Sequence, residues 1–178
     1  MKKFNYSRIC NYICVVLMLC LLVTQFLPFW ECVDCENCED GMVSLAEYFW
    51  NPREHKACAN SMTQVYKDYF GDNIVDAKGK PFKFNASLIV IPTLIIFIAA
   101  VLTTFFGLRH GKKAIVAIIP LIAGIAGVYG YTSVLALQVG PNWQLHLGLC
   151  IAVLVISVIS LTGLIPQAKA KFKELFYN

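Results

Sequence analysis

Long apolar runs separated by short polar stretches dominate this chain. Runs without an acidic or basic residue extend over residues 9–30, 84–108 and 114–168. A helix needs about 20 apolar residues to cross the hydrocarbon of a bilayer, so the third run is long enough for two spans. A polar turn at 138–142, with Gly140 and Pro141, divides it. The pattern predicts an all-α integral membrane protein, a bundle of four transmembrane helices that forms a single domain over 1–178. The spans are expected near 10–30, 85–107, 114–137 and 143–165.

The first connection between spans, residues 31–84, is long and polar, and we call it the polar segment. Ser44 and Glu47 have the spacing of a capping box, which predicts a short helix over 45–50. A second helix is expected over 60–70, where Gly71 ends it. A small hairpin is expected to bring 74–76 close to 82–84.

Charge predicts the orientation of the spans. Nine lysines and arginines lie outside the polar segment, with Glu174 as their one acidic neighbour, whereas the polar segment holds the other ten acids and six bases. Lys and Arg near span ends favour the cytoplasmic face. We expect a multi-pass protein of the cell membrane with both termini cytoplasmic and the polar segment outside. The first span lacks a small-x-small cleavage site and is expected to stay as a signal anchor.

Composition argues against two classes of function. Charged residues make up 15% of the 178, compared with about one quarter in soluble domains, and no basic face suited to nucleic acid is evident. The predicted spans contain no Asp, Glu, Lys or Arg, although ion-coupled transporters generally need such groups. His146 is expected to be a hydrogen-bonded group near the outer interface. Thr24 and Gln25 are expected to face other helices.

Four cysteines gather in the polar segment: Cys32, Cys35, Cys38 and Cys58. Outside the cytoplasm cysteines usually oxidise, and each bridge would stabilise a small loop by about 2 to 4 kcal/mol. We favour two structural disulfides with no cofactor. Four cysteines allow three connectivities, and the sequence does not choose between them.

Zinc binding is one alternative for these cysteines. Cys32, Cys35 and Cys38, together with Cys58 or His55, could supply the four tetrahedral ligands that zinc takes in proteins. The favoured interpretation ranks above it because zinc needs the thiolates reduced.

Redox exchange through the Cys-x-x-Cys pairs is the other alternative. In topology the chain resembles the quinone-coupled disulfide-forming membrane proteins, which are also short four-helix chains with cytoplasmic termini. The resemblance implies thiol–disulfide oxidoreductase activity at Cys32, Cys35, Cys38 and Cys58. The chain departs from that pattern because the turn at 138–142 has no cysteine pair. In addition, nearby carboxylates disfavour a reactive thiolate: Asp34, Glu36, Glu39 and Asp40.

Small residues recur at helical spacing in the third span: Ala123, Gly124, Ala126, Gly127 and Gly130. Such residues let helix backbones approach closely within membranes. We favour packing inside one chain over homodimerisation.

The first helix of the polar segment is unusually apolar, and its candidate interaction surface consists of Met42, Leu45, Tyr48, Phe49 and Trp50. These residues could lie as a lid on the spans or at the membrane interface, or they could form the segment's own small core. The sequence predicts a small polytopic membrane protein that serves as an interaction or accessory subunit through a disulfide-stapled loop. An enzyme is the less favoured class. The expected partners are the lipid bilayer and a membrane protein, either a second copy or a different chain.

Overall fold

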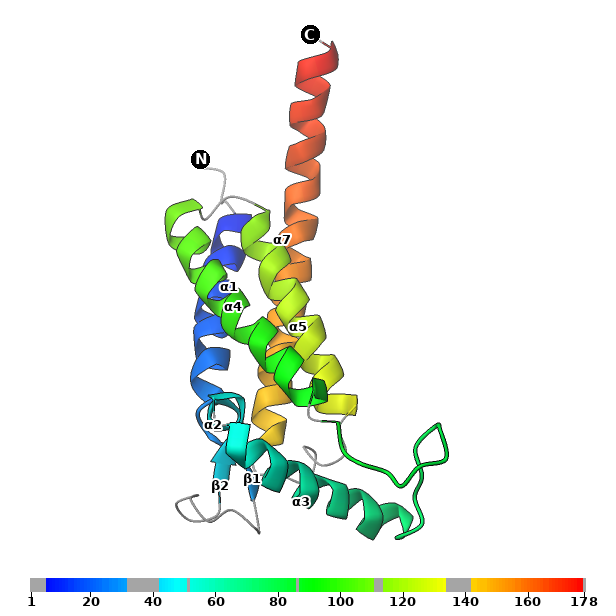
Figure 1. The fold of residues 1–178 in the computed structure, drawn as a ribbon. Helices are drawn as coiled ribbons and strands as arrows, with labels where there is room; N and C mark the ends of the chain where they lie inside the picture. Colours follow the sequence, from blue (N-terminus) through cyan, green and yellow to red (C-terminus); the bar gives the residue numbers. More distant parts are fainter. Residues whose placement is uncertain are drawn as a thin grey trace. The chain divides into compact units, whose positions relative to one another are not determined.

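The computed structural model describes residues 6–31, 42–50, 52–85, 87–110, 114–133 and 142–177. The described chain is mainly helical, as the apolar runs predict (Figure 1). Its elements, in chain order, are α1 (Tyr6–Thr24), β1 (Pro28–Glu31), β2 (Met42–Ser44), α2 (Leu45–Trp50), α3 (Pro52–Phe70), α4 (Ser87–His110), α5 (Ile115–Ser133) and α7 (Trp143–Tyr177).

Three of the described helices contain stretches long and apolar enough to cross a membrane: Ser87–Arg109, Ile115–Ser133 and Trp143–Gly163. The apolar part of α1, Ile9–Thr24, is shorter. These helices indicate a membrane-embedded, multi-pass protein.

Contacts divide the chain into two compact units. Unit 1 consists of Met1–Leu22, Ile95–Ala126 and Gly148–Asn178. Unit 2 consists of Val23–Leu94 and Gly127–Leu147, and so contains the polar segment.

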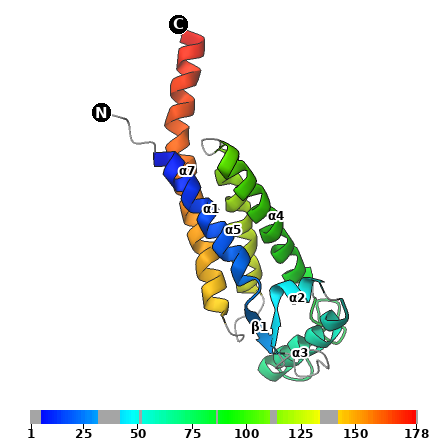
Figure 2. The ribbon, with the colours of Figure 1, turned by 90° about the vertical axis from the view of Figure 1, so that its left-hand side faces the viewer.

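Unit 1 is built from parts of α1, α4, α5 and α7, which lie side by side in both ribbon views (Figures 1 and 2). Apolar side chains fill its interior and also cover its surface: Met18 and Ile96 are fully buried, whereas Val101 and Leu108 are mostly exposed. A water-soluble domain rarely exposes apolar surface so continuously. Such a surface suits lipid.

Close helix contacts in unit 1 depend on glycine. A Cβ built on Gly124 of α5 would lie 3.0 Å from Leu154 Cβ and 3.1 Å from the Cys150 carbonyl oxygen of α7. A Cβ on Gly107 of α4 would collide with Val15 of α1. Small residues are what allow these backbones to approach.

Buried polar side chains connect α1 with α7 in unit 1. Ser160 Oγ donates a hydrogen bond to Asn11 Oδ1 over 2.5 Å, and both side chains are fully buried. One turn away, Cys14 Sγ lies 3.6 Å from Ser157 Oγ. Hydrogen bonds of this kind stabilise helix pairs inside membranes.

Unit 2 contains a small antiparallel sheet that the sequence pattern did not predict. β1 pairs with β2, with Glu31 opposite Met42 and Trp30 opposite Val43, and an irregularity follows Pro28. Because the sheet joins residue 31 to residue 42, it holds together the two ends of the cysteine-containing stretch 32–41.

The end of the polar segment folds back on α3. The Tyr66 ring lies 4.9 Å from that of Phe82 and 6.1 Å from that of Phe84. The Phe84 backbone N–H donates to Thr63 Oγ1 over 3.0 Å. The expected hairpin forms around one isolated bridge, Val75 to Pro81. The Phe82 N–H donates to Ile74 O over 3.0 Å, and the Asp76 N–H donates to Lys80 O over 2.8 Å.

Three helix ends differ from the predictions. α1 ends at Thr24 and not near residue 30, because the chain turns and enters β1 at Pro28. α3 begins at Pro52 and not near residue 60, since proline suits the first turn of a helix, where its missing N–H costs nothing. α7 continues past Pro166 to Tyr177, whereas the fourth span was expected over 143–165. A proline inside a helix removes one hydrogen bond, and here the helix continues beyond it.

Candidate functional site

The turn after α1, residues 24–28, connects several elements of unit 2, and we call it the joint. Three of its backbone carbonyl oxygens have partners from other parts of unit 2. Thr24 O lies 2.6 Å from His146 Nε2, Gln25 O accepts from the Ala46 N–H over 2.9 Å, and Pro28 O accepts from Asn142 Nδ2 over 2.8 Å. Thr24 O also accepts from the Leu27 N–H over 3.0 Å, so the joint is held both within the turn and by residues of α2 and of the start of α7.

The backbone conformation at position 142 favours asparagine. Its φ angle is 63°, in the left-handed region, where asparagine is more readily accommodated than most residues. This conformation begins α7 at Trp143 and leaves the Asn142 side chain free to reach Pro28 O.

His146 and Tyr131 form a buried pair beside the joint. Their rings stack with centroids 5.4 Å apart and planes inclined by 15°, and the His146 side chain is fully buried. His146 Nδ1 also lies 3.0 Å from Asn142 O, and the Tyr131 hydroxyl donates a long 3.4 Å hydrogen bond to Gln25 Oε1. His146 is thus a hydrogen-bonded group, as the sequence indicates, and its side chain is buried within unit 2. Gln25 and Thr24 are buried against other elements, as expected.

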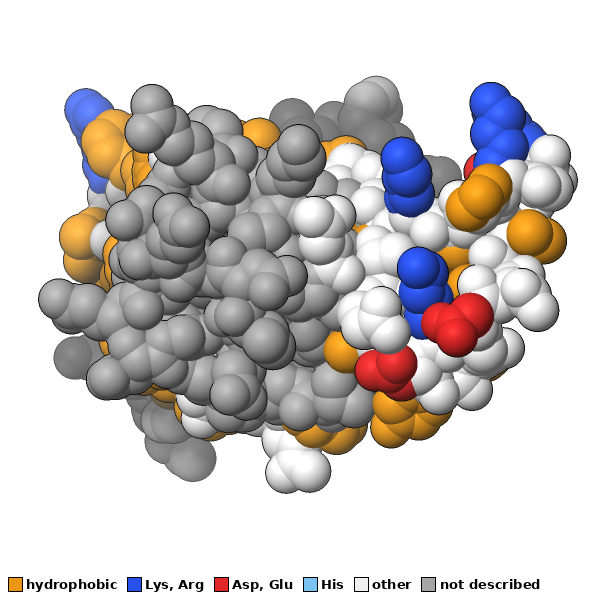
Figure 3. Space-filling view, turned by 60° about the horizontal axis from the view of Figure 1, so that its bottom comes forward, with side chains coloured by type: hydrophobic (Ala, Val, Ile, Leu, Met, Phe, Trp, Pro, Cys, Tyr) orange, Lys and Arg blue, Asp and Glu red, His pale blue; other side chains and the backbone are white. Residues whose placement is uncertain are grey.

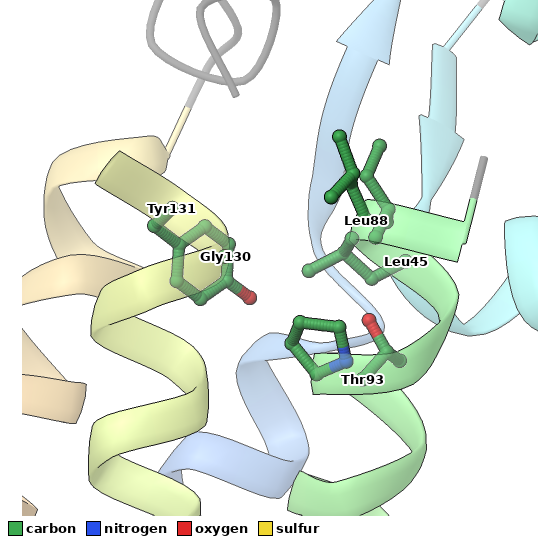
Figure 4. A pocket seen from close by; sticks show the side chains of 7 residues that line it. Leu45, Leu88, Thr93, Gly130 and Tyr131 are labelled. Carbon is green, nitrogen blue, oxygen red and sulfur yellow. The ribbon is translucent and has the colours of Figure 1, made fainter. Parts of the chain in front are cut away.

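A small pocket adjoins this pair. It is lined by Leu45 of α2, by Leu88, Ile89, Pro92 and Thr93 of α4, and by Gly130 and Tyr131 of α5. Figure 4 shows the Leu45 side chain and the Tyr131 ring directed toward it from opposite sides. The pocket is barely large enough for one water molecule. Pockets for small-molecule ligands are usually about 300 to 1,000 Å³, so this one is far too small to hold a typical substrate.

α2 has one buried end and one exposed end. Leu45 and Ala46 are 1% and 2% exposed, whereas Trp50 is 69% exposed. The Trp50 ring meets the half-buried Phe49 ring edge-on, with centroids 4.9 Å apart. The predicted interaction surface is therefore divided between interior and surface. The side chains of Met42 and Tyr48 lie outside the described residues.

The cysteine predictions fall mostly outside the described residues. Cys32, Cys35 and Cys38 belong to that part of the chain, and the backbones of His55 and Cys58 lie in α3 without a described side chain. Disulfides, zinc binding and redox exchange at these positions therefore stay predictions. Among described residues the cysteines Cys10, Cys14, Cys20 and Cys150 are free, and no group of three or more His, Cys, Asp or Glu could hold a metal ion.

The predicted packing residues of α5 are divided between the two units. Ala123 and Gly124 are buried in unit 1, where Gly124 meets α7. Gly130 belongs to unit 2, where a Cβ would lie 2.8 Å from Pro92 Cγ of α4. Gly127 is buried, and Ala126 is half-buried.

The described part of one face of the molecule mixes charges of both signs with apolar side chains (Figure 3). The described charged residues of α3 and the turn after it include Lys67, Asp68, Asp72, Asp76, Lys78 and Lys80.

Sequence reasoning missed the joint as a site. The signal available was the polarity of Thr24, Gln25 and Tyr131 at the ends of apolar runs, but it does not reveal which carbonyls these elements satisfy. Comparison with models of protein families, with curated proteins and with solved structures finds no match to this chain.

Proposed function

We propose that this chain is a four-span protein of the cell membrane that acts as an interaction or accessory subunit. Its polar segment lies outside the membrane and docks a partner membrane protein. Both termini lie in the cytoplasm. The single observation that carries the proposal is the exposure of Trp50 at the end of a helix whose other end is buried.

The four-span arrangement is supported by the apolar part of α1, Ile9–Thr24, after which the chain continues without a charged residue to Trp30. Together with the three longer apolar helices, α1 would complete a bundle of four spans. The connections between successive spans would then lie on alternate sides of the membrane. The distribution of Lys and Arg supports the orientation.

Trp50 has the properties of an interface anchor. Tryptophan is enriched among residues that contribute most to binding between proteins, because one side chain buries a large area. Leu45 and Ala46 hold the start of α2 in the interior of unit 2, so Trp50 is presented on an ordered element. A partner with an apolar recess would bury this ring.

Two features support docking through a stapled loop. The first is the small size of the pocket beside Tyr131, which offers no space for a typical substrate. The pairing of β1 with β2 closes the stretch that carries Cys32, Cys35 and Cys38, which supports a stapled loop.

Purification from native membranes in a mild detergent tests the proposal. The wild-type chain should elute in a complex larger than its own 19.9 kDa, and Trp50→Ser should release it. Tyr69→Ser is the matched control, since Tyr69 is also a mostly exposed aromatic residue of the polar segment and should leave the complex intact. A partnerless wild-type monomer with thiol oxidase activity would overturn the proposal.

The state of the cysteines separates the proposal from its alternatives. Mass spectrometry of protein prepared without reductant should show Cys32, Cys35, Cys38 and Cys58 permanently paired. Cycling of these cysteines when a quinone is supplied would support the oxidoreductase instead. Stoichiometric zinc with reduced thiols would support the metal site.

A further inference from the structure

We propose that α2 is a relay that transmits movement of Trp50 to Tyr131 at the end of α5. The proposal rests on the proposed function in one respect: a docked partner is what would move Trp50. The connection between Trp50 and Tyr131 is a property of unit 2 itself and needs no partner to be measured.

The first connection runs through side-chain packing. Leu45 and Tyr131 line the same pocket, and Figure 4 shows them on opposite sides of it. Protein interiors are normally close-packed, so a buried side chain that moves displaces its neighbours. Here the pocket is barely large enough for one water molecule, and the Leu45 side chain is 1% exposed. A change in the position of Leu45 would therefore displace the side chains that line the pocket, Tyr131 among them.

The second connection runs through hydrogen bonds and ring stacking. The residue after Leu45, Ala46, donates its N–H to Gln25 O, and Gln25 Oε1 accepts from the Tyr131 hydroxyl. The Tyr131 ring also stacks on His146, whose Nε2 lies 2.6 Å from Thr24 O. Leu45 and Ala46 of α2 are thus connected to Tyr131 separately. Leu45 is connected through the side chains that line the pocket, and Ala46 through the hydrogen bonds of Gln25 in the joint.

α2 is short; it follows β2 directly, and one residue separates it from α3. Its six residues extend for about 9 Å, so a tilt at Trp50 also reorients Leu45. β2 ends at Ser44, immediately before α2, and Ser44 pairs with Pro28 of β1. The sheet therefore provides a pivot next to Leu45, while Trp50 is the end that a partner can move.

The relay ends on helices that are candidates for membrane spans. Tyr131 lies in the last turn of α5, and the first turns of α4 supply Leu88, Ile89, Pro92 and Thr93 to the pocket. Docking outside the membrane would in this way alter the packing between α4 and α5, where the Gly130 backbone already lies close to Pro92.

Fluorescence anisotropy of Trp50 tests the relay in purified protein. The chain has three tryptophans, so Trp30→Phe and Trp143→Phe leave Trp50 as the single emitter. In this background Leu45→Ala should lower the anisotropy of Trp50, because α2 loses its contact with the pocket. Tyr131→Phe should lower it by less, since only the long hydrogen bond to Gln25 is lost. The double variant should deviate from the sum of the two changes.

Tyr129→Phe is the matched control, since this tyrosine of α5 is mostly exposed and does not line the pocket. It should leave the anisotropy unchanged. Circular dichroism and the melting temperature check folding, and if Leu45→Ala fails to fold, Leu45→Val should give a smaller change of the same sign. Unchanged anisotropy in the Leu45 and Tyr131 variants would overturn the relay, as would an equal change in Tyr129→Phe. Loss of the complex in Trp50→Ser is a separate result, so failure of the relay and failure of docking are distinguishable.

Discussion

Several buried polar residues are paired between elements that lie far apart along the chain, whereas one described hydroxyl is unsatisfied. Asn11 pairs with Ser160 in unit 1, and Tyr131 pairs with Gln25 in unit 2. Thr103 of α4 is fully buried, and its hydroxyl has no hydrogen-bond partner among the described residues. A buried hydroxyl left in this state lowers stability by about 1 to 3 kcal/mol.

Thr103→Val should therefore stabilise the protein. Valine has nearly the same shape as threonine and removes the unsatisfied hydroxyl, so the free energy of unfolding should rise by about 1 kcal/mol. Thr104→Val is the control, because the Thr104 hydroxyl already donates to Ala100 O over 2.8 Å and its loss should not stabilise. Melting temperatures in detergent provide the measurement. A lower melting temperature for Thr103→Val would mean that the hydroxyl has a stabilising role.

At the scale of the elements, α5 packs through glycine on two neighbours. Gly124 meets the backbone of α7 in unit 1, and Gly130 meets the Pro92 ring of α4 in unit 2. The sequence predicted close packing from these residues but could not assign the partner helices. Small-residue spacing is the same whether the neighbour belongs to the same chain or to a second copy.

Gly124→Ala should destabilise the protein, and Gly148→Ala should not. The new methyl group at Gly124 would press on the Cys150 carbonyl and the Leu154 backbone nitrogen, both at 3.1 Å, at a cost of about 1 to 3 kcal/mol. Nothing in the described structure lies within 4 Å of a Cβ at Gly148. Thermal unfolding of both variants checks the difference. Equal melting temperatures would contradict the packing of α5 against α7.

The sequence predicted where helices form, but it did not predict several of the helix ends or the contacts of the joint. Apolar runs longer than a bilayer is thick can hardly form anything but helices. The end of α1 at Thr24 depends instead on long-range contacts, since His146 and Asn142 hold the carbonyls of the turn from more than a hundred residues away along the chain. The β1–β2 sheet was not predicted because its strands have four and three residues, too few to show a reliable alternation of apolar and polar positions.

At the scale of the whole molecule, the polar segment is proposed to lie outside and the basic termini inside. Val75 of the polar segment and Arg109 at the end of α4 are both exposed, so cysteines introduced there are accessible to reagents. A membrane-impermeant maleimide should label Val75→Cys on intact cells and Arg109→Cys only after permeabilisation, each relative to the wild-type chain. The reverse pattern would invert the proposed topology.

The exposed end of α2 provides the most direct test of the docking function. A photo-crosslinking amino acid placed at position 50 in native membranes should form a single major adduct with one membrane protein on illumination. The same amino acid at position 69, which is mostly exposed in the wild-type chain, should not form that adduct. Crosslinks only to lipid, or equal adducts from both positions, would contradict the claim that Trp50 docks a partner.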